Sequence, residues 1–224
     1  MNFNQIFYNS HRCPTELCHI GEKYGTDKSP LVYSMGHHSY TPFYNFLFSS
    51  IRYRPIVFGE IGIYKNASMK MWREYFPNAT LYGWDSKPEH STEERYRYDF
   101  VENAKSENLN NVIYDYMNVR DETSIIESFE KTNTKFDVII DDSSHDFWDQ
   151  NKIIINAYKY LNPGGILIIE DVTCSIWSFG NQIEMGGFQK YYQNLTHVRT
   201  SSSNQQYPYD RDELLVFIKN EVTK

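Results

Sequence analysis

The sequence predicts an α/β fold with a mostly parallel seven-stranded sheet, helices on both faces and an antiparallel hairpin at the C-terminal end. From residue 55 onward, short β-branched runs alternate with segments of helical periodicity, a pattern typical of right-handed βαβ units. Several of these runs end in glycine or in carboxylates, and ligands bind such sheets at the carboxyl ends of the strands. The 224 residues suffice for one domain with an elaboration.

The expected elements follow one another as repeated strand–helix units. A helix is expected directly after Thr41, because Pro42 suits the first helical turn. Further helices are expected at 68–76, 123–131 and 147–161, the last one stopped by Asn-Pro-Gly-Gly. Strands are expected at 55–62, 80–85, 111–117, 136–142, 165–171, 195–200 and 213–219. Residues 1–50 are interpreted as an N-terminal helical cap that contributes to a cofactor site, and residues 51–224 as the main domain.

Composition argues against several classes of protein. The net charge of −7 disfavours a general nucleic-acid binder, which needs a basic face to neutralise phosphates. No apolar run approaches the roughly 20 residues of a membrane span, and the N-terminus lacks the pattern of a secretory signal. The three cysteines suggest a reducing, cytoplasmic setting. The 19 tyrosines suit a pocket for a polar ligand, although AT-rich coding is the simpler explanation.

The turn after the first expected strand carries the first candidate site. Gly62 lets the backbone approach a ligand at the start of the next helix, and Glu60 suits a ligand with a cationic amino group. The later glycines of a dinucleotide-binding turn are missing. Asp85 ends the second strand, 23 residues beyond Gly62, where a carboxylate commonly binds ribose hydroxyls. These residues favour a nucleoside-containing cofactor, and an ordinary tight turn with a loop aspartate is the alternative.

Carboxylates at two further strand ends form the second candidate site. Asp141 and Asp142 end one buried strand, and Glu170 and Asp171 end the next. Neighbouring parallel strands lie about 4.8 Å apart, so Asp142 and Asp171 can share one divalent cation. His145 follows Asp142 by three residues and suits proton abstraction near neutral pH. The alternative is a pair of helix caps beside a surface histidine.

Several short motifs of this chain occur together in one known family. They are Tyr24-Gly25-Thr26-Asp27-Lys28, His38-Ser39-Tyr40-Thr41 with Tyr44, Glu60-Ile61-Gly62, Ser68 through Met71-Trp72, Tyr82-Gly83-Trp84-Asp85, Ile140-Asp141-Asp142-Ser143-Ser144-His145, and Gly164-Gly165 through Ile169-Glu170-Asp171. With them the chain resembles class I S-adenosylmethionine (SAM)-dependent methyltransferases. Within that family it resembles the metal-dependent sugar O-methyltransferases of the macrocin and mycinamicin type, which act in macrolide and surface-glycan (polysaccharide) biosynthesis.

The resemblance implies a Rossmann-like fold and a role for each matched position. The positions implied to bind SAM are Lys28, Tyr40, Glu60, Gly62, Ser68, Asp85, Asn118 and Asp141. Asp142 and Asp171 are implied to bind Mg²⁺ or Mn²⁺, with Asp142 and His145 as the catalytic residues and His145 as the general base. The cofactor turn departs from the family pattern, because Ile63 and Tyr64 stand where relatives carry glycines.

The activity that the resemblance implies is methyl transfer from SAM to a sugar hydroxyl. The acceptor is a nucleotide-linked sugar, a surface glycan or a natural-product glycoside, and aromatic residues near 177–209 are expected to stack on it. The alternatives are a catechol-type small-molecule O-methyltransferase, an inactive SAM-fold binding module in a glycan-assembly complex, and a nicotinamide oxidoreductase. The intact motifs at 141–145 and 170–171 argue against an inactive module. The identity of the sugar, the hydroxyl that is methylated and a homo-oligomeric state are left open.

Overall fold

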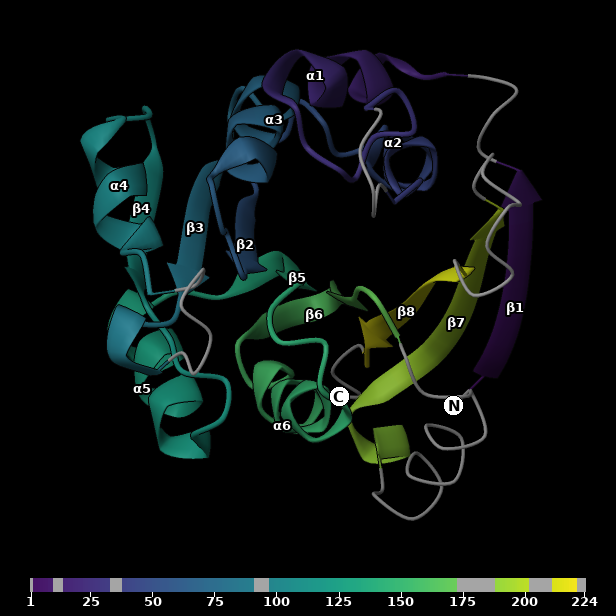
Figure 1. Ribbon diagram of the computed structural model, residues 1–224. Helices are drawn as coiled ribbons and strands as arrows, with labels where there is room; N and C mark the ends of the chain where they lie inside the picture. The colour runs from purple at the N-terminus through teal and green to yellow at the C-terminus, as the bar shows by residue number, and fades with distance from the viewer. Residues whose placement is uncertain are drawn as a thin grey trace.

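A computed structural model describes residues 2–9, 14–32, 38–90, 97–172, 188–201 and 211–220. In this part of the chain, the strands form a single eight-stranded sheet with the order β1-β7-β8-β6-β5-β2-β3-β4. Helices pack on both of its faces (Figure 1). The α/β class and the mostly parallel sheet predicted from the sequence are confirmed.

The strands match the predicted runs closely, with one addition. Seven lie at or near the expected positions: β2 (Val57–Ile61), β3 (Thr80–Asp85), β4 (Val112–Tyr116), β5 (Phe136–Asp141), β6 (Leu161–Ile169), β7 (Tyr192–Ser201) and β8 (Arg211–Lys219). Strand β8 runs antiparallel to both β6 and β7, so the predicted terminal hairpin is confirmed. The eighth strand, β1 (Asn2–Asn9), pairs in parallel with β7 at the sheet edge. It was not predicted, because most of its described side chains are exposed and no burial pattern marks it.

The helices begin where local signals favour a helical start. Their bounds are α1 (Glu16–Tyr24), α2 (Thr41–Phe48), α3 (Ala67–Tyr75), α4 (Phe100–Ser106), α5 (Glu122–Thr132) and α6 (Phe147–Ala157), with short 3₁₀ turns at Pro88–His90 and Phe188–Lys190. Pro42 occupies the first turn of α2, as predicted. Asp121 and Asp146 cap α5 and α6 by accepting backbone N–H groups of the first turn. Helices α1 and α4 had not been predicted.

The predicted helix at 147–161 is too long. It ends at Ala157, and Leu161 already belongs to β6. The backbone N–H of Phe136 donates to the carbonyl of Tyr160 at 2.8 Å, which ties this segment to β5. The Asn-Pro-Gly-Gly run therefore lies within β6 and does not follow a helix directly. It forms an irregularity in the strand, because Phe136 pairs with Leu161, whereas Val138, only two residues later, pairs with Ile166.

Two apolar layers hold the helices against the sheet. One layer joins α1, α2 and α3 to one face and includes the mutually packed rings of Phe48, Phe58 and Trp72. The other joins α5 and α6 to the opposite face, with Trp84 and Phe129 at its centre. Each such ring stabilises the fold by about 1.5–3 kcal/mol when fully buried. In the described ranges, no helix combines the length and the apolar character that crossing a membrane requires.

The carboxyl ends of four neighbouring strands meet at one edge. In the sheet, Ile61 of β2 lies between Trp84 of β3 and Asp141 of β5, and Asp141 lies beside Ile169 of β6. Gly62 has a φ of +90°, and a Cβ there would lie 2.0 Å from the carbonyl oxygen of Asp142. Only glycine fits this contact, so the turn after β2 packs directly on the turn after β5.

Candidate active site

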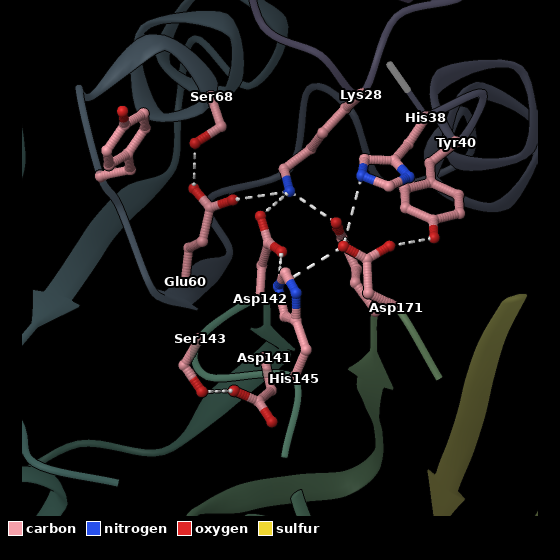
Figure 2. A network of polar contacts seen from close by, with 12 residues as sticks. Lys28, His38, Tyr40, Glu60, Ser68, Asp141, Asp142, Ser143, His145 and Asp171 are labelled. Atoms are coloured by element: carbon pink, nitrogen blue, oxygen red, sulfur yellow. Dashed lines mark hydrogen bonds and ion pairs between the residues drawn. The ribbon is translucent and has the colours of Figure 1, made fainter. Parts of the chain in front are cut away.

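Two carboxylates and one imidazole converge at the carboxyl edge of the sheet. The Nε2 atom of His145 lies 3.0 Å from Asp142 Oδ1 and 3.4 Å from Asp171 Oδ2. One ligand atom from each of the three residues lies within 4.8 Å of the others. The two carboxylate oxygens fit a hard divalent cation such as Mg²⁺ or Mn²⁺, and the imidazole lies beside them. The structure thus brings together the three residues predicted for the metal and the base (Figure 2).

The backbone is strained at two of these three residues. His145 has a φ of +56° and Asp171 a φ of +51°, in the left-handed region that residues with side chains rarely adopt. Such conformations cost free energy and persist where the surrounding structure imposes them. Here they turn the His145 and Asp171 side chains toward the same point.

Lys28 lies at the centre of the carboxylate cluster. Its ammonium donates to Asp142 Oδ2 and, at 2.6 Å, to Glu170 Oε2, and it lies 3.6 Å from Glu60 Oε1. Only 1% of Lys28 is exposed. Burial works to lower the pKa of this ammonium, but the charges of Asp142, Glu170 and Glu60 raise it well above its usual value. Lys28 is therefore a permanent cation that joins the ends of three strands.

The same N-terminal segment supplies further partners. The hydroxyl of Tyr40 donates to Asp171 Oδ1 at 2.5 Å, and that of Tyr44 donates to Glu170 Oε1 at 2.6 Å. His38 stacks on the ring of Tyr40, and its Nε2 lies 3.3 Å from Asp171 Oδ2. In the sequence, His38 and Tyr44 stand out only as parts of a motif, and no role is predicted for them. Their contacts are with carboxylates more than 120 residues away, which no local sequence pattern predicts.

A second group of carboxylates next to the metal-type triad is fully buried. Glu60 Oε2 accepts the hydroxyl of Ser68 at 2.8 Å, and Asp141 Oδ1 accepts that of Ser143 at 2.6 Å. Among the described residues, Glu60 Oε1 and Asp141 Oδ2 have no hydrogen-bond partner. Buried polar atoms are nearly always paired, so these two oxygens fit a ligand that carries hydrogen-bond donors or positive charge.

Asp85 and Asn118 lie at the ends of the next two strands. Asp85 accepts the backbone N–H groups of Tyr64 and Ser86, at 2.8 and 2.7 Å. Asp85 thereby fastens the end of β3 to the turn after β2. Asn118 follows β4, and its side-chain oxygen accepts the N–H of Arg120 at 3.2 Å. The hydrogen bonds that Asn118 makes with the described residues are local, and none joins it to the carboxylate cluster.

Burial and neighbouring charges shift the ionisation of the cluster in opposite directions. Burial raises the pKa of Glu60 to about 7 and that of Asp141 to about 6. Burial also acts to raise the pKa of Asp142, but the charge of Lys28 and the contact with His145 hold it well below its usual range. Burial lowers the pKa of His145, while the hydrogen bond to Asp142 and the charges of Asp142 and Asp171 raise it to about 9. Asp142 and His145 thus favour their charged forms, whereas Glu60 and Asp141 hold their protons more tightly than free carboxylates do.

Comparison with known proteins identifies the family. Residues 66–209, more than half of the chain, match the family described as "Methyltransferase domain", so the chain belongs to this family. The family predicted from the motifs is thereby confirmed.

Named relatives act on sugars of natural products. The chain is 27% identical over 166 residues to the 8-demethyl-8-(2-methoxy-alpha-L-rhamnosyl)-tetracenomycin-C 3'-O-methyltransferase of Streptomyces olivaceus, which covers 71% of this chain and 37% of that protein. It is 26% identical over 178 residues to the mycinamicin VI 2''-O-methyltransferase of Micromonospora griseorubida, covering 75% of this chain and 39% of that protein. The chain thus spans less than two fifths of the length of these relatives.

Solved structures share the fold. The methyltransferase MycE from the mycinamycin biosynthetic pathway, in complex with Mg and SAH, matches with a TM-score of 0.62 and 19% identity, over 93% of this chain and 56% of that chain. A putative O-methyltransferase from Klebsiella pneumoniae matches with a TM-score of 0.57 and 15% identity, over 94% of this chain and 93% of that chain. At these identities the likeness concerns the fold alone.

One prediction lies outside the described residues. The aromatic side chains expected to stack on an acceptor fall mostly within 173–187 and 202–210, which the structure does not describe.

Proposed function

We propose that this chain carries the catalytic site of a SAM-dependent O-methyltransferase that methylates a sugar hydroxyl. The observation that carries the proposal is a metal-type triad of Asp142, His145 and Asp171 beside two buried oxygens, one of Glu60 and one of Asp141, that accept no hydrogen bond from the described residues. The relatives named as O-methyltransferases of rhamnosyl tetracenomycin and mycinamicin support a sugar on a natural-product glycoside as the acceptor class. A nucleotide-linked sugar and a surface glycan are the other forms of the same acceptor.

SAM fits the buried side of this edge. Glu60 Oε1 lies 3.6 Å from Lys28 Nζ but accepts no hydrogen bond from the described residues, so a SAM ammonium would provide the donor that it lacks, and Ser68 fixes the other oxygen of Glu60. Asp85 would accept the ribose hydroxyls, with its carboxylate held at the end of β3 by two backbone N–H groups. Asn118, at the end of β4, would lie toward the adenine. When bound, SAM supplies an electrophilic methyl group, so the protein has to orient the acceptor and remove its proton.

A divalent cation fits the exposed side of the edge. Asp142 and Asp171 would hold Mg²⁺ or Mn²⁺, as two carboxylates on adjacent strand ends commonly do. When bound, the cation supplies a Lewis acid that lowers the pKa of an acceptor hydroxyl. The solved MycE complexes with Mg and SAH support this pairing of cofactor and metal in the fold.

In its neutral form, which a cation held by Asp142 and Asp171 would favour over the imidazolium, His145 would then accept the proton of the hydroxyl. Its imidazole is 39% exposed, the most open of the three triad side chains, and a general base must reach the proton that it removes. Asp142 and Asp171 fix the position of the ring through Nε2. Within residues 1–50, α1, α2 and the described residues between them would act as a cap on this site, because Lys28, Tyr40 and Tyr44 reach its carboxylates, whereas β1 belongs to the sheet.

The direct test is turnover with methyl-labelled SAM. A panel of rhamnosylated and other glycosides is incubated with the 224-residue chain, and label in the product and release of S-adenosylhomocysteine are measured before and after removal of metal. We expect transfer to a sugar hydroxyl that stops on chelation and returns with Mg²⁺ or Mn²⁺. Full activity in exhaustively chelated protein would contradict the metal assignment, and binding of NAD in place of SAM would contradict the cofactor.

A further inference from the structure

In each of the two carboxylates of the triad, the two oxygens contact different partners. Asp142 turns Oδ1 toward His145, at 3.0 Å from Nε2, and its Oδ2 accepts the ammonium of Lys28. Asp171 turns Oδ2 toward His145, at 3.4 Å from Nε2, and its Oδ1 accepts the hydroxyl of Tyr40 at 2.5 Å. Each carboxylate therefore has one oxygen held by Lys28 or Tyr40 of the N-terminal segment and one oxygen facing the imidazole of His145 (Figure 2). The Asp171 oxygen that faces His145 also lies 3.3 Å from Nε2 of His38.

The two donors that hold the outer oxygens are fixed to each other. The carbonyl of Lys28 accepts the backbone N–H groups of both Tyr40 and Thr41, each at 3.0 Å. Both side chains are buried, with Lys28 1% and Tyr40 0% exposed. The ring of Tyr40 packs between His38 and Tyr44. The ammonium and the hydroxyl thus form one rigid unit, although Lys28 and Tyr40 lie 114 and 131 residues away from their carboxylates.

We infer that Lys28 and Tyr40 are a pair of positioning residues for the metal, which rests on the metal site proposed above. By locking one oxygen of each carboxylate, they point Asp142 Oδ1 and Asp171 Oδ2 at the place that a divalent cation would occupy beside His145. Hydrogen bonds that orient a ligating carboxylate are typically worth about 10- to 100-fold in metal affinity. The resemblance implies a cofactor role for both residues. A cofactor role predicts that removal of the side chain weakens SAM binding, whereas a positioning role predicts that it weakens metal binding.

Tyr40 is the sharper residue to test, because Lys28 also contacts Glu60 on the cofactor side. Tyr40→Phe removes only the hydroxyl on Asp171 and keeps the ring packing. The matched control is Tyr75→Phe, since Tyr75 is also fully buried and its hydroxyl also bonds the N-terminal segment, at Asn45, 3.3 Å away. Binding of Mn²⁺ is followed by the electron paramagnetic resonance signal of the free ion, and binding of SAM by calorimetry.

The expected result is an increase of about 10- to 100-fold in the Mn²⁺ dissociation constant of Tyr40→Phe, with SAM binding unchanged. Saturating Mn²⁺ should restore kcat, which loss of a purely structural contact would not allow. Tyr75→Phe should bind Mn²⁺ like the wild type. Unchanged Mn²⁺ affinity in Tyr40→Phe would overturn the inference, and weakened SAM binding with intact Mn²⁺ binding would place Tyr40 at the cofactor. Wild-type protein that binds no Mn²⁺ would overturn the metal site itself, and the inference with it.

Discussion

The two sides of the carboxyl edge are built from the same residue types but differ in how their oxygens are partnered. On the side proposed for the cofactor, Glu60 and Asp141 are 0% and 1% exposed, and each has one oxygen that accepts no hydrogen bond from the part of the chain that the structure describes. On the metal side, Asp142 and Asp171 are partly exposed, and each of their oxygens contacts a basic side chain or a hydroxyl. One side is incomplete without a ligand, and the other is assembled in advance by the protein.

The difference follows from the cost of buried charge. An ionised carboxylate without a partner is expensive in a dry interior, so the pKa values of Glu60 and Asp141 rise. A cationic ligand such as SAM would remove that cost on binding. Lys28 and the imidazoles already stabilise the charges on the metal side, so a cation there has to be selected by geometry. The predictions below test this contrast.

The largest effect is expected on kcat, from substitution of His145, the most exposed residue of the triad. His145→Ala should lower kcat by about 10²–10⁴-fold, because a general base typically contributes that much. SAM affinity should not change, since Glu60 and Asp85 lie on the other side. Steady-state kinetics with a confirmed acceptor measures kcat, and calorimetry measures SAM binding. His19→Ala, an exposed histidine paired with Glu22 on α1, is the control, and wild-type kcat in His145→Ala would remove His145 from the mechanism.

Lys28→Met should destabilise the carboxylates on both sides of the edge. It leaves Glu60, Glu170 and Asp142 without their shared cation, and breaking a buried ion pair typically costs about 3–5 kcal/mol. Denaturant unfolding should show a drop of that order in the free energy of unfolding. The exposed pair of Lys23 and Glu74 provides the contrast, because solvent screens this pair and Lys23→Met should leave the free energy of unfolding nearly unchanged. Equal losses in the two variants would mean that the buried cluster does not depend on its lysine.

Glu60→Gln should affect the cofactor side alone. A charge-assisted hydrogen bond is worth about 1.5–3 kcal/mol, so the SAM dissociation constant should rise by about 10- to 100-fold. Asp85→Ala should weaken SAM binding by a similar amount, because the ribose would lose its acceptor. Mn²⁺ binding should stay at its wild-type value in both variants. A combined loss of Mn²⁺ and SAM binding would show that the two sides are not separable.

The smallest effect is a pH dependence of stability. The pKa of Glu60 is raised by burial from 4.5 to about 7, so the folded protein holds this proton more tightly than the unfolded chain does. Its contribution to stability is therefore fully present below about pH 4.5 and is lost as the pH rises through about 7. Glu60→Gln lacks this loss, so the difference in free energy of unfolding should move in favour of the variant as the pH rises from about 5 to about 8. Denaturant unfolding across this range measures the difference, and parallel pH curves would contradict it.

Most of the sheet and the main site residues could be predicted, because their signals are local. Buried strands appear as apolar runs, and Asp142, Glu170 and Asp171 follow such runs directly. Gly62 was recognised at a turn where a side chain would strike the Asp142 carbonyl. The end of α6 was placed wrongly, because a run of Asn-Pro-Gly-Gly suits an irregular strand as well as a helix stop. Strand β1 was missed, because pairing with β7 comes from a segment almost 200 residues away.

The sequence by itself determined which groups reach the carboxyl edge, because strand ends and the residues after them are neighbours in the chain. Only the tertiary structure decided which oxygen each carboxylate turns to which partner. Lys28 and Tyr40 meet Asp142 and Asp171 across more than 110 residues, and no periodicity or spacing records such a contact. The physical reason is that these contacts arise when α1, α2 and α3 pack their apolar faces on the sheet, which fixes the N-terminal segment over the strand ends.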